Sequence, residues 1–519
     1  MPVIEEADEG EANEHLDDAN TGVELPASTL AQMRAVLGRC GAGLELDSLP
    51  AEMAGPVLAR VDRPLLMAQV SKRWRTAVLG AKPRLPLRYV VDPAKYHASV
   101  STDKNAEMLA DLAAKCGQYD VVAITISRLH LLFTDASGLS ALLPRCPNLA
   151  SLDLSNNVLR VATLTGLRAC TALTTLDLSW VIDNVGNPAW LAGALPATLR
   201  ELHLKGVNLD DETSIEGLSA ALDACPGLVL LDLQQNNLRT SGALARMLPK
   251  LSALEHLDLS SARLNMTALR DAASSLRACT ALTHLDVADL DCDSRRWGDD
   301  PQSERVQAQN LAGVEFLDML PSWPALKFLG LSRMYVGPDA THLAAALLAL
   351  PALTHLDLEQ CRIGSQGTRN IAAALPAMPR LAHLNLYSCE TRDIGVQALV
   401  AVLPQCQALM TLRLGHNHIT GASAEGVVGF VSQCPNLTKL NMRPSDFDQE
   451  SIEAIVAAWR AQHEPRGECT FETRGGSLVC EATHFEGREI AGGNAGISSG
   501  QYIRTEREGN GGRGGPPQR

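Results

Sequence analysis

Residues 353–358 read Leu-Thr-His-Leu-Asp-Leu, and this unit, Leu-x-x-Leu-x-Leu, returns along most of the chain. Eleven copies occur, of which the sixth ends in Val287 and the last in Met442 in place of leucine. The first leucines of the copies are at positions 149, 173, 199, 228, 254, 282, 326, 353, 381, 409 and 437. All steps but one are 24 to 29 residues long, and such constancy is typical of a repeat architecture.

Each copy predicts a short strand followed by a helix. Apolar and polar residues alternate at Leu356-Asp357-Leu358, which indicates a strand with its leucines facing inward. Apolar helical stretches follow most strands, for example at 341–350 and 393–403. Leu-Pro pairs end these helices, because proline lacks an amide hydrogen and restricts the residue before it. The prolines are Pro144, Pro196, Pro249, Pro321, Pro351, Pro376 and Pro404.

Strands joined by crossover helices are parallel, so the copies predict one continuous sheet with helices on its outer face. Strands stack about 4.8 Å apart, whereas helices are roughly 10 Å wide. The array must therefore bend into a horseshoe whose strands line the hollow. A weaker copy at Val121-Ile124-Ile126 and a candidate strand at 87–91 extend the array to residues 84–443.

The spacing resembles the leucine-rich repeat family, and the step of 28 residues resembles its ribonuclease-inhibitor class. The resemblance implies an α/β leucine-rich repeat solenoid. The family's Asn or Cys after the strand occurs at Asn157, Asn236, Cys361, Cys389 and Asn417. The other copies, where we expect irregular turns, have Val181, Val207, Ala262, Leu290, Met334 and Ser445 at this position.

Other segments flank the array. Residues 1–22 are predicted to be a disordered acidic leader, since the first 20 residues contain eight carboxylates and no lysine or arginine. Residues 23–83 are predicted to be a small helical module. Residues 444–465 read as a closing helix, and 466–519 as a largely disordered, glycine-rich tail. The closing helix directs Ile452, Ile455, Val456 and Trp459 toward the core.

The helical module resembles an F-box, through its Leu-Pro opening, an apolar pair and a closing Val-Ser-Lys-Arg-Trp helix. So few residues cannot bury enough apolar surface alone, which indicates a partner. The resemblance implies that this partner is the Skp-type adaptor of cullin ubiquitin ligases. The adaptor-binding residues that it implies are Leu49, Pro50, Val57, Leu58, Leu65, Val70 and Trp74. The alternative is that residues 44–80 only cap the first repeat.

Candidate target-binding residues lie in the hollow. The middle leucine of a copy faces inward, so the third, fifth and seventh residues project into the hollow. The fifth position is acidic along most of the array, and basic residues gather at its carboxyl end. The step of 44 residues between Leu282 and Leu326 hides an insertion at 292–303, either an interface anchor or an unselected excursion. The candidates are Trp180, Asp232, Asp258, Asp286, Arg296, Trp297, Phe328, Asp357, Tyr387 and Arg413.

Histidines recur at the third position, at His256, His284, His355 and His383. The first two, with Asp258 and Asp286, present ligands that a metal ion accepts. A ladder of repeat-consensus residues hydrogen-bonded to their neighbours is the favoured interpretation, so we expect no metal and no cofactor.

Composition limits the function. The formal net charge is -14, from 59 acidic and 45 basic residues, which disfavours nucleic-acid binding. No stretch of eighteen apolar residues and no secretory signal occurs, which predicts a soluble protein without a membrane contact. Of thirteen cysteines, six precede a first leucine by three residues: Cys146, Cys170, Cys225, Cys279, Cys406 and Cys434. Repeat-locked thiols indicate packing in a reducing compartment, the cytoplasm, with the nucleus or delivery into a host cell as alternatives.

These features predict a protein that is not an enzyme. No nucleophile-base pairing, phosphate loop or zinc spacing is present. The predicted function is substrate recognition in a Skp/cullin/F-box ubiquitin ligase, as a monomer within a hetero-complex that binds the adaptor and a protein substrate. The alternative is a binding or inhibitory scaffold of ribonuclease-inhibitor type, including a bacterial effector that acts in a host cell.

Overall fold

The computed structural model describes most of the predicted repeat array. The described residues are 86–90, 102–118, 120–127, 137–159, 161–183, 191, 193–210, 212–239, 241–290, 304–337, 339–443, 445–463, 468–473 and 476–481. The acidic leader, the F-box-like module, the insertion at 292–303 and the tail beyond 481 lie outside these residues.

The described strands form one long sheet of 15 strands, and β4 pairs with β6 in a second, two-stranded sheet. In the long sheet each strand pairs with its neighbour in chain order, and all pairs are parallel except the last. The strands of the long sheet are β1 (Pro86–Val90), β2 (Asp120–Thr125), β3 (Ser151–Asp153), β5 (Thr175–Asp177), β7 (Glu201–His203), β8 (Leu230–Asp232), β9 (His256–Asp258), β10 (His284–Asp286), β11 (Phe328–Gly330), β12 (His355–Asp357), β13 (His383–Asn385), β14 (Thr411–Arg413), β15 (Lys439–Asn441), β16 (Glu468–Thr473) and β17 (Gly476–Glu481). The small sheet contains β4 (Val158–Leu159) and β6 (Ile182–Asp183).

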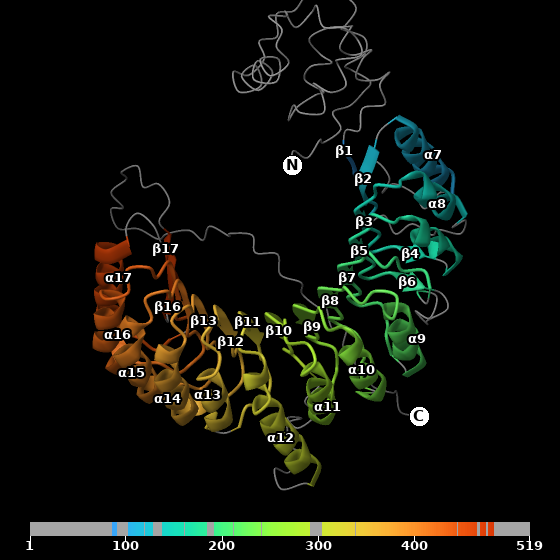
Figure 1. Ribbon diagram of the computed structural model, residues 1–519. Helices are drawn as coiled ribbons and strands as arrows, with labels where there is room; N and C mark the ends of the chain where they lie inside the picture. Colours follow the sequence, from blue (N-terminus) through green and yellow to red (C-terminus); the bar gives the residue numbers. More distant parts are fainter. Residues whose placement is uncertain are drawn as a thin grey trace, which may run out of the picture. The chain divides into compact units, whose positions relative to one another are not determined.

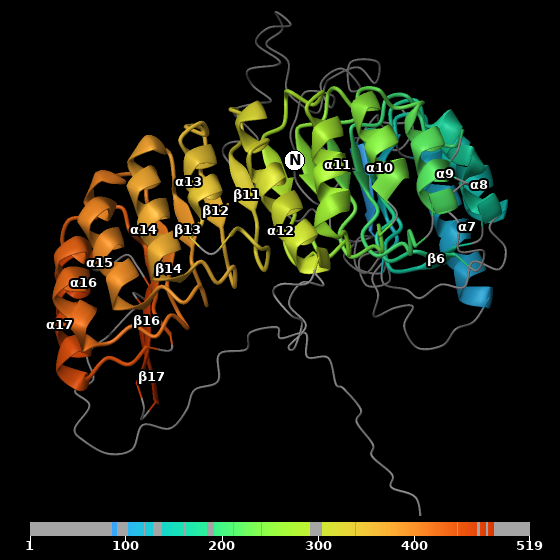
Figure 2. The ribbon, with the colours of Figure 1, turned by 90° about the horizontal axis from the view of Figure 1, so that it is seen from below.

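Helices cover the outer side of the curved sheet, and the strands line its inner side (Figure 1, Figure 2). The helices are α7 (Thr102–Gln118), α8 (Ser137–Leu142), α9 (Glu212–Leu222), α10 (Ser241–Met247), α11 (Met266–Leu276), α12 (Glu304–Leu317), α13 (Thr341–Leu347), α14 (Gly364–Ala374), α15 (Arg392–Val402), α16 (Ala424–Val431) and α17 (Gln449–His463). The predicted parallel sheet with helices outside is confirmed. None of the described helices combines the length and apolar character needed to cross a bilayer.

The Leu-Pro pairs mark a change of helix type. After α10 and α15 the chain tightens into 3-10 turns at Leu248–Lys250 and Leu403–Gln405, with proline in the first turn. Proline is tolerated there because the first amides of a helical turn have no partner within it. The turn then delivers the chain to the next strand.

The middle leucines of the repeats form the spine of the core. Each pairs in register with the middle leucine of the next strand, without a shift from β3 to β15. All are buried, and each contributes roughly 2 kcal/mol of burial free energy. They are Leu152, Leu176, Leu202, Leu231, Leu257, Leu285, Leu329, Leu356, Leu384, Leu412 and Leu440.

The cysteines predicted to pack are buried and form no disulfide among the described residues. Several donate to a carbonyl of the preceding repeat: Cys225 Sγ to Pro196 O at 3.4 Å, and Cys279 Sγ to Leu251 O at 3.2 Å. Burial raises the pKa of Cys225 and of Cys279 to about 11, so both remain thiols. Because the thiolate is the reactive form of cysteine, these thiols are unreactive, and their hydrogen bonds to the preceding repeat give them a structural role.

The carboxyl end differs from the predicted tail. The closing helix is present as α17, and Ile452, Ile455, Val456 and Trp459 are buried as expected. Beyond it, β16 pairs parallel with β15, and β17 folds back antiparallel on β16. The sheet therefore continues past residue 443, into a segment without a leucine repeat.

The ninth residue of a repeat closes the turn after the strand. Asn417 is fully buried, and its amide donates to Leu386 O at 2.6 Å and Leu414 O at 2.8 Å. Its carbonyl oxygen accepts the N–H groups of Cys389 at 2.9 Å and Thr391 at 3.1 Å. One side chain thus satisfies backbone groups of two repeats. Asn236 makes similar bonds, whereas Asn157 Oδ1 is buried without a partner among the described residues.

We expect Asn417→Ala to lower the free energy of unfolding by about 3 kcal/mol, because it leaves several buried backbone groups without partners. Urea denaturation followed by circular dichroism measures the loss. Asn436→Ala is the control, since that exposed amide donates only to Gln407 O among described residues. Equal losses for the two variants would contradict a special role for Asn417.

Candidate recognition surface

The inner side of the sheet presents the third, fifth and seventh residues of each repeat, which together we call the concave surface. In most middle strands the central leucine is buried and the residues on either side of it are partly exposed, as in β9 and β12, whereas Gly330 of β11 and Asn385 of β13 are buried. Side chains on successive strands lie opposite one another because the register is constant. Each repeat position therefore forms a row that runs across the strands.

Five rings at the third position form the ring stack, defined as His256, His284, Phe328, His355 and His383. The centroids of His256 and His284 lie 3.6 Å apart with planes 9° from parallel, and His284 stacks on Phe328 at 4.0 Å. Phe328 and His355 are tilted at 5.8 Å, and His355 stacks on His383 at 4.1 Å. The expected ladder is thus held mainly by ring stacking, and His355 also makes a hydrogen bond to a neighbour, between its Nδ1 and Thr354 Oγ1 at 2.8 Å.

The imidazoles of the stack resist protonation. Burial lowers the pKa of His284 to about 4, and the neighbouring imidazoles His256 and His355 add to the effect. Burial also lowers the pKa of His256, of His355 and of His383. Near neutral pH the stack is therefore an uncharged aromatic strip whose ring nitrogens offer hydrogen-bond acceptors.

Beside the rings runs the acidic row, defined as Asp232, Asp258, Asp286 and Asp357. Each carboxylate accepts the amide N–H two residues later, at 2.8 to 3.0 Å. This bond fixes one carboxylate oxygen at the strand end. Asn385 and Asn441 make the same turn with an amide oxygen, so the turn itself does not require a charge.

The centre of the acidic row lacks compensation by lysine or arginine. Burial raises the pKa of Asp286 to about 6, and repulsion from Asp258 and Asp357 contributes. Burial raises the pKa of Asp258 as well, with repulsion from Asp232. Asp232 differs, because His203 lies 3.6 Å away and lowers its pKa although burial opposes this.

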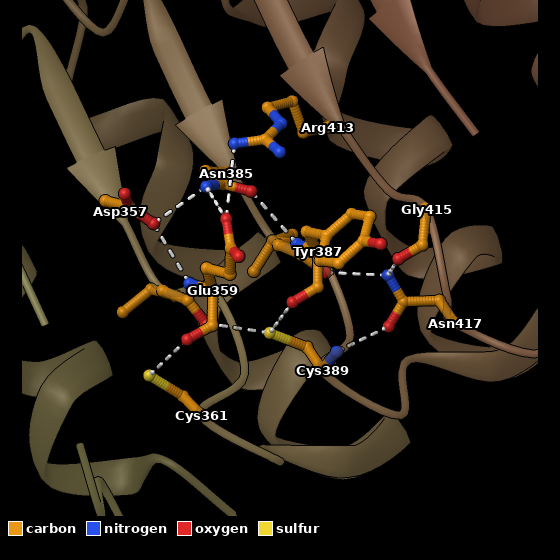
Figure 3. Close-up of polar contacts among 11 residues, drawn as sticks. Asp357, Glu359, Cys361, Asn385, Tyr387, Cys389, Arg413, Gly415 and Asn417 are labelled. Carbon is orange, nitrogen blue, oxygen red and sulfur yellow. Dashed lines mark hydrogen bonds and ion pairs between the residues drawn. The ribbon is translucent and has the colours of Figure 1, made fainter. Parts of the chain in front are cut away.

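The row changes sign toward β14 (Figure 3). Arg413 donates to Glu359 at 3.2 Å, and its guanidinium carbon lies 5.4 Å from the ring centroid of Tyr387. Asn385 joins the network by donating to Asp357 at 2.8 Å and to Glu359 at 3.1 Å. These bonds fix a polar and aromatic corner at the carboxyl side of the surface.

The structure places most of the predicted target-binding residues on one face. The acidic row, Phe328, Tyr387 and Arg413 all lie on the concave surface between β8 and β14. Arg296, Trp297 and the seven adaptor-binding residues lie outside the described residues. Whether any of them contacts a target stays a prediction.

Trp180 lies apart from this set. It occupies the eighth position of its repeat, where the backbone is left-handed with φ of 58°, and 42% of it is exposed. Its indole lies over Gly206, the eighth residue of the next repeat, where a Cβ would meet the ring at 2.5 Å. It therefore belongs to a different row, at the turns.

The row of turns was missed by the sequence analysis. The eighth residue has a positive φ in every copy from β3 to β14, including non-glycine residues such as Gln235 and Arg333. Its members also contact one another: Arg333 pairs with Asp289 at 3.0 Å, and Ser261 donates to Asp289 at 3.0 Å. Ser, Asn and Asp at several of these positions were the signal that could have indicated the turns, since short polar side chains favour turns.

Among the described residues no group of three or more His, Cys, Asp and Glu side chains is arranged to hold a metal ion. The imidazoles nearest to the acidic row are held face to face in the ring stack. What the surface provides is therefore hydrogen-bonding groups, negative charge and ring edges.

Comparison with known proteins gives the class of the chain. A family described as Leucine Rich repeat matches residues 350–372, which contain β12 and most of α14. Together with the repeat spacing and the parallel sheet, this match supports a leucine-rich repeat solenoid. Such solenoids present extended concave binding surfaces.

Individual relatives match parts of the chain. Tonsoku-like protein of Bos taurus is 37% identical over 177 residues, and that of Mus musculus is 37% identical over 180. Each match covers 33% of this chain and 12% of the relative's length, so the chain spans only a small part of these relatives. A solved internalin of Listeria monocytogenes shares 18% identity, with a TM-score of 0.40, over 65% of this chain and 77% of that chain.

The raised pKa of Asp286 predicts the pH dependence of a variant. Between about pH 6 and the ordinary pKa of 3.8, the folded protein holds a proton that the unfolded chain has released, so its contribution to stability grows as pH falls. Asp286→Asn is therefore expected to raise the melting temperature above pH 6 and to lose this advantage near pH 4. Differential scanning fluorimetry across this range measures the difference from wild type.

His284→Phe is expected to show the opposite trend. The unfolded chain takes up a proton near pH 6.5, but folded His284 does so only near pH 4, so stability is lost as pH falls through this window. Phenylalanine stands at the same position in β11 and removes this titration. The difference in melting temperature between His284→Phe and wild type should grow as pH falls. If this difference changed with pH in the same direction for Asp286→Asn and His284→Phe, the pKa shifts of both residues would be contradicted.

Proposed function

We propose that this chain is a non-catalytic scaffold that binds a protein partner on the concave surface between β8 and β14. The observation that carries the proposal is the set of aligned rows, in which a ring stack, an acidic row and the Arg413–Tyr387 corner share one face. Aromatic residues and arginine are the residue types that contribute most to protein interfaces. The strands hold these side chains rigidly, which lowers the entropic cost of binding.

A finer function that we propose is substrate recognition in a Skp/cullin ubiquitin ligase. The support is the F-box-like pattern from Leu49 to Trp74, which the sequence places before the repeats. In this role the amino-terminal module binds the adaptor, and the concave surface holds the protein to be modified. The competing proposal is a scaffold or inhibitor whose residues 44–80 only cap the array.

Replacing rings of the concave surface tests the scaffold. Phe328→Ala combined with Tyr387→Ala is expected to weaken partner binding about tenfold or more, because central aromatic side chains contribute most at interfaces. Quantitative affinity capture compares the variant with wild type. The control is Leu348→Ala with Ile394→Ala, which removes exposed apolar groups from the outer layer. Equal losses in both variants, or no loss in either, would refute the concave site.

The adaptor proposal predicts that Leu49→Ala with Pro50→Ala abolishes copurification of a Skp-type adaptor while leaving the melting temperature of the repeats unchanged. Immunoprecipitation with quantitative mass spectrometry measures the adaptor. Deletion of residues 1–80 separates the two proposals, since a docking module is removable, whereas removal of a cap destabilises the array. Unchanged adaptor binding in the double variant would contradict the proposed ligase role.

A further inference from the structure

We propose that the partner presents a lysine- or arginine-bearing protein segment to the acidic row, whose centre is Asp258 and Asp286. This inference rests on the proposed scaffold function and names the chemistry of the partner. Three features of the surface support it: central carboxylates without a lysine or arginine partner, a carboxylate oxygen without a hydrogen-bond partner among the described residues, and a neutral wall that suits long cationic side chains.

The charge of Asp258 and Asp286 is not neutralised from within the surface, whereas Asp232 has His203 and Lys205 as neighbours. At the third, fifth and seventh positions of β8 to β12 the chain has five carboxylates and no lysine or arginine. The fifth carboxylate, Glu359, is paired with Arg413. Among the described residues, no lysine or arginine forms an ion pair with Asp258, Asp286 or Asp357. A cation from outside would relieve repulsion that now acts between neighbouring strands.

Asp286 has a carboxylate oxygen without a partner among the described residues and a glycine as its neighbour on the next strand. Its Oδ1 accepts the amide of Ala288, and the described residues provide no partner for its Oδ2. The residue paired with it on β11 is Gly330, where an added Cβ would lie 2.4 Å from Oδ1. Glycine therefore leaves room for this carboxylate where the row would otherwise carry a further side chain. An ammonium or guanidinium group is the complement of an oxygen held in this way.

The ring stack supplies the wall beside the row. Within the stacked pairs the rings cover one another's faces, so a ligand meets mainly their edges, whereas Phe328 and His355 are tilted apart. Neutral imidazole edges accept hydrogen bonds without repelling a cation, and the rings offer apolar contact. The aliphatic stems of lysine and arginine lie well on such a strip while their charged ends reach carboxylates.

The length of the acidic row and the change from acidic to basic residues at its carboxyl end limit how long the cationic part of the segment can be. From β8 to β12 the row spans four strand steps, about 19 Å, which an extended chain covers in about six residues. Arg413, Lys439 and Arg443 follow at the carboxyl end of the surface. The cationic part of the segment must therefore end before β14, and an acidic segment would be repelled along most of the row.

Fluorescence anisotropy with three labelled twelve-residue peptides tests the inference on the full chain. The peptides alternate serine with lysine, with glutamate or with glycine. We expect the lysine peptide to bind at least about tenfold more tightly than the other two at physiological ionic strength. We expect Asp258→Asn with Asp286→Asn to weaken it about tenfold while preserving the turns, as Asn385 and Asn441 do.

The matched control removes two carboxylates elsewhere. Glu212→Gln with Glu216→Gln changes the net charge equally on α9, where both pair with Arg246. Its lysine-peptide affinity should match that of wild type. Equal weakening in both double variants would mean that the peptide responds only to the net charge of the protein. No weakening in the Asp variant would refute the acidic site. Either result overturns the proposal.

Failure of this inference is distinguishable from failure of the scaffold. If Phe328→Ala with Tyr387→Ala loses the partner but Asp258→Asn with Asp286→Asn keeps it, the concave surface binds and the cationic segment is wrong. If neither variant loses the partner, the scaffold site itself is wrong. Loss of both the partner and the lysine peptide in the Asp variant supports the two proposals together.

Discussion

Each middle leucine packs beside the middle leucine of the next strand, and the same register holds from β3 to β15. Burial of these side chains requires that every strand meet its neighbour without a shift, because a slip of one residue would turn the leucines outward. The constraint acts on the core, yet it also organises the opposite face. Residues three, five, seven and eight of successive repeats are forced into rows.

Rows of like residues have opposite consequences for different side chains. Flat rings gain from stacking, as His256, His284 and Phe328 do. Carboxylates in a row repel one another, and this repulsion adds to the burial that raises the pKa of Asp286. The backbone N–H of Ala288 compensates in part by bonding to the carboxylate. The remaining imbalance is electrostatic, and it is the property from which we infer a ligand of opposite charge.

The sequence predicted the site unevenly. The acidic row followed from spacing alone, since position five is read directly from the leucines. The sequence placed the four histidines at one repeat position, but only the structure shows that Phe328 of β11 lies between His284 and His355, stacked on the first and tilted against the second. Trp180 was assigned to the hollow, but a left-handed residue at the turn directs it onto Gly206. Backbone conformation at one position is not encoded in apolar periodicity.

Leucine spacing by itself determined the parallel sheet, the outer helices and the order of the rows, because a periodic apolar pattern leaves only one face to bury. Tertiary structure alone decided what the rows do. The stacking of His256 on His284, the room that Gly330 leaves for Asp286, and the addition of β16 to a sheet edge all depend on contacts between segments 28 to 44 residues apart. Such contacts arise from packing geometry, which no local pattern of residue types specifies.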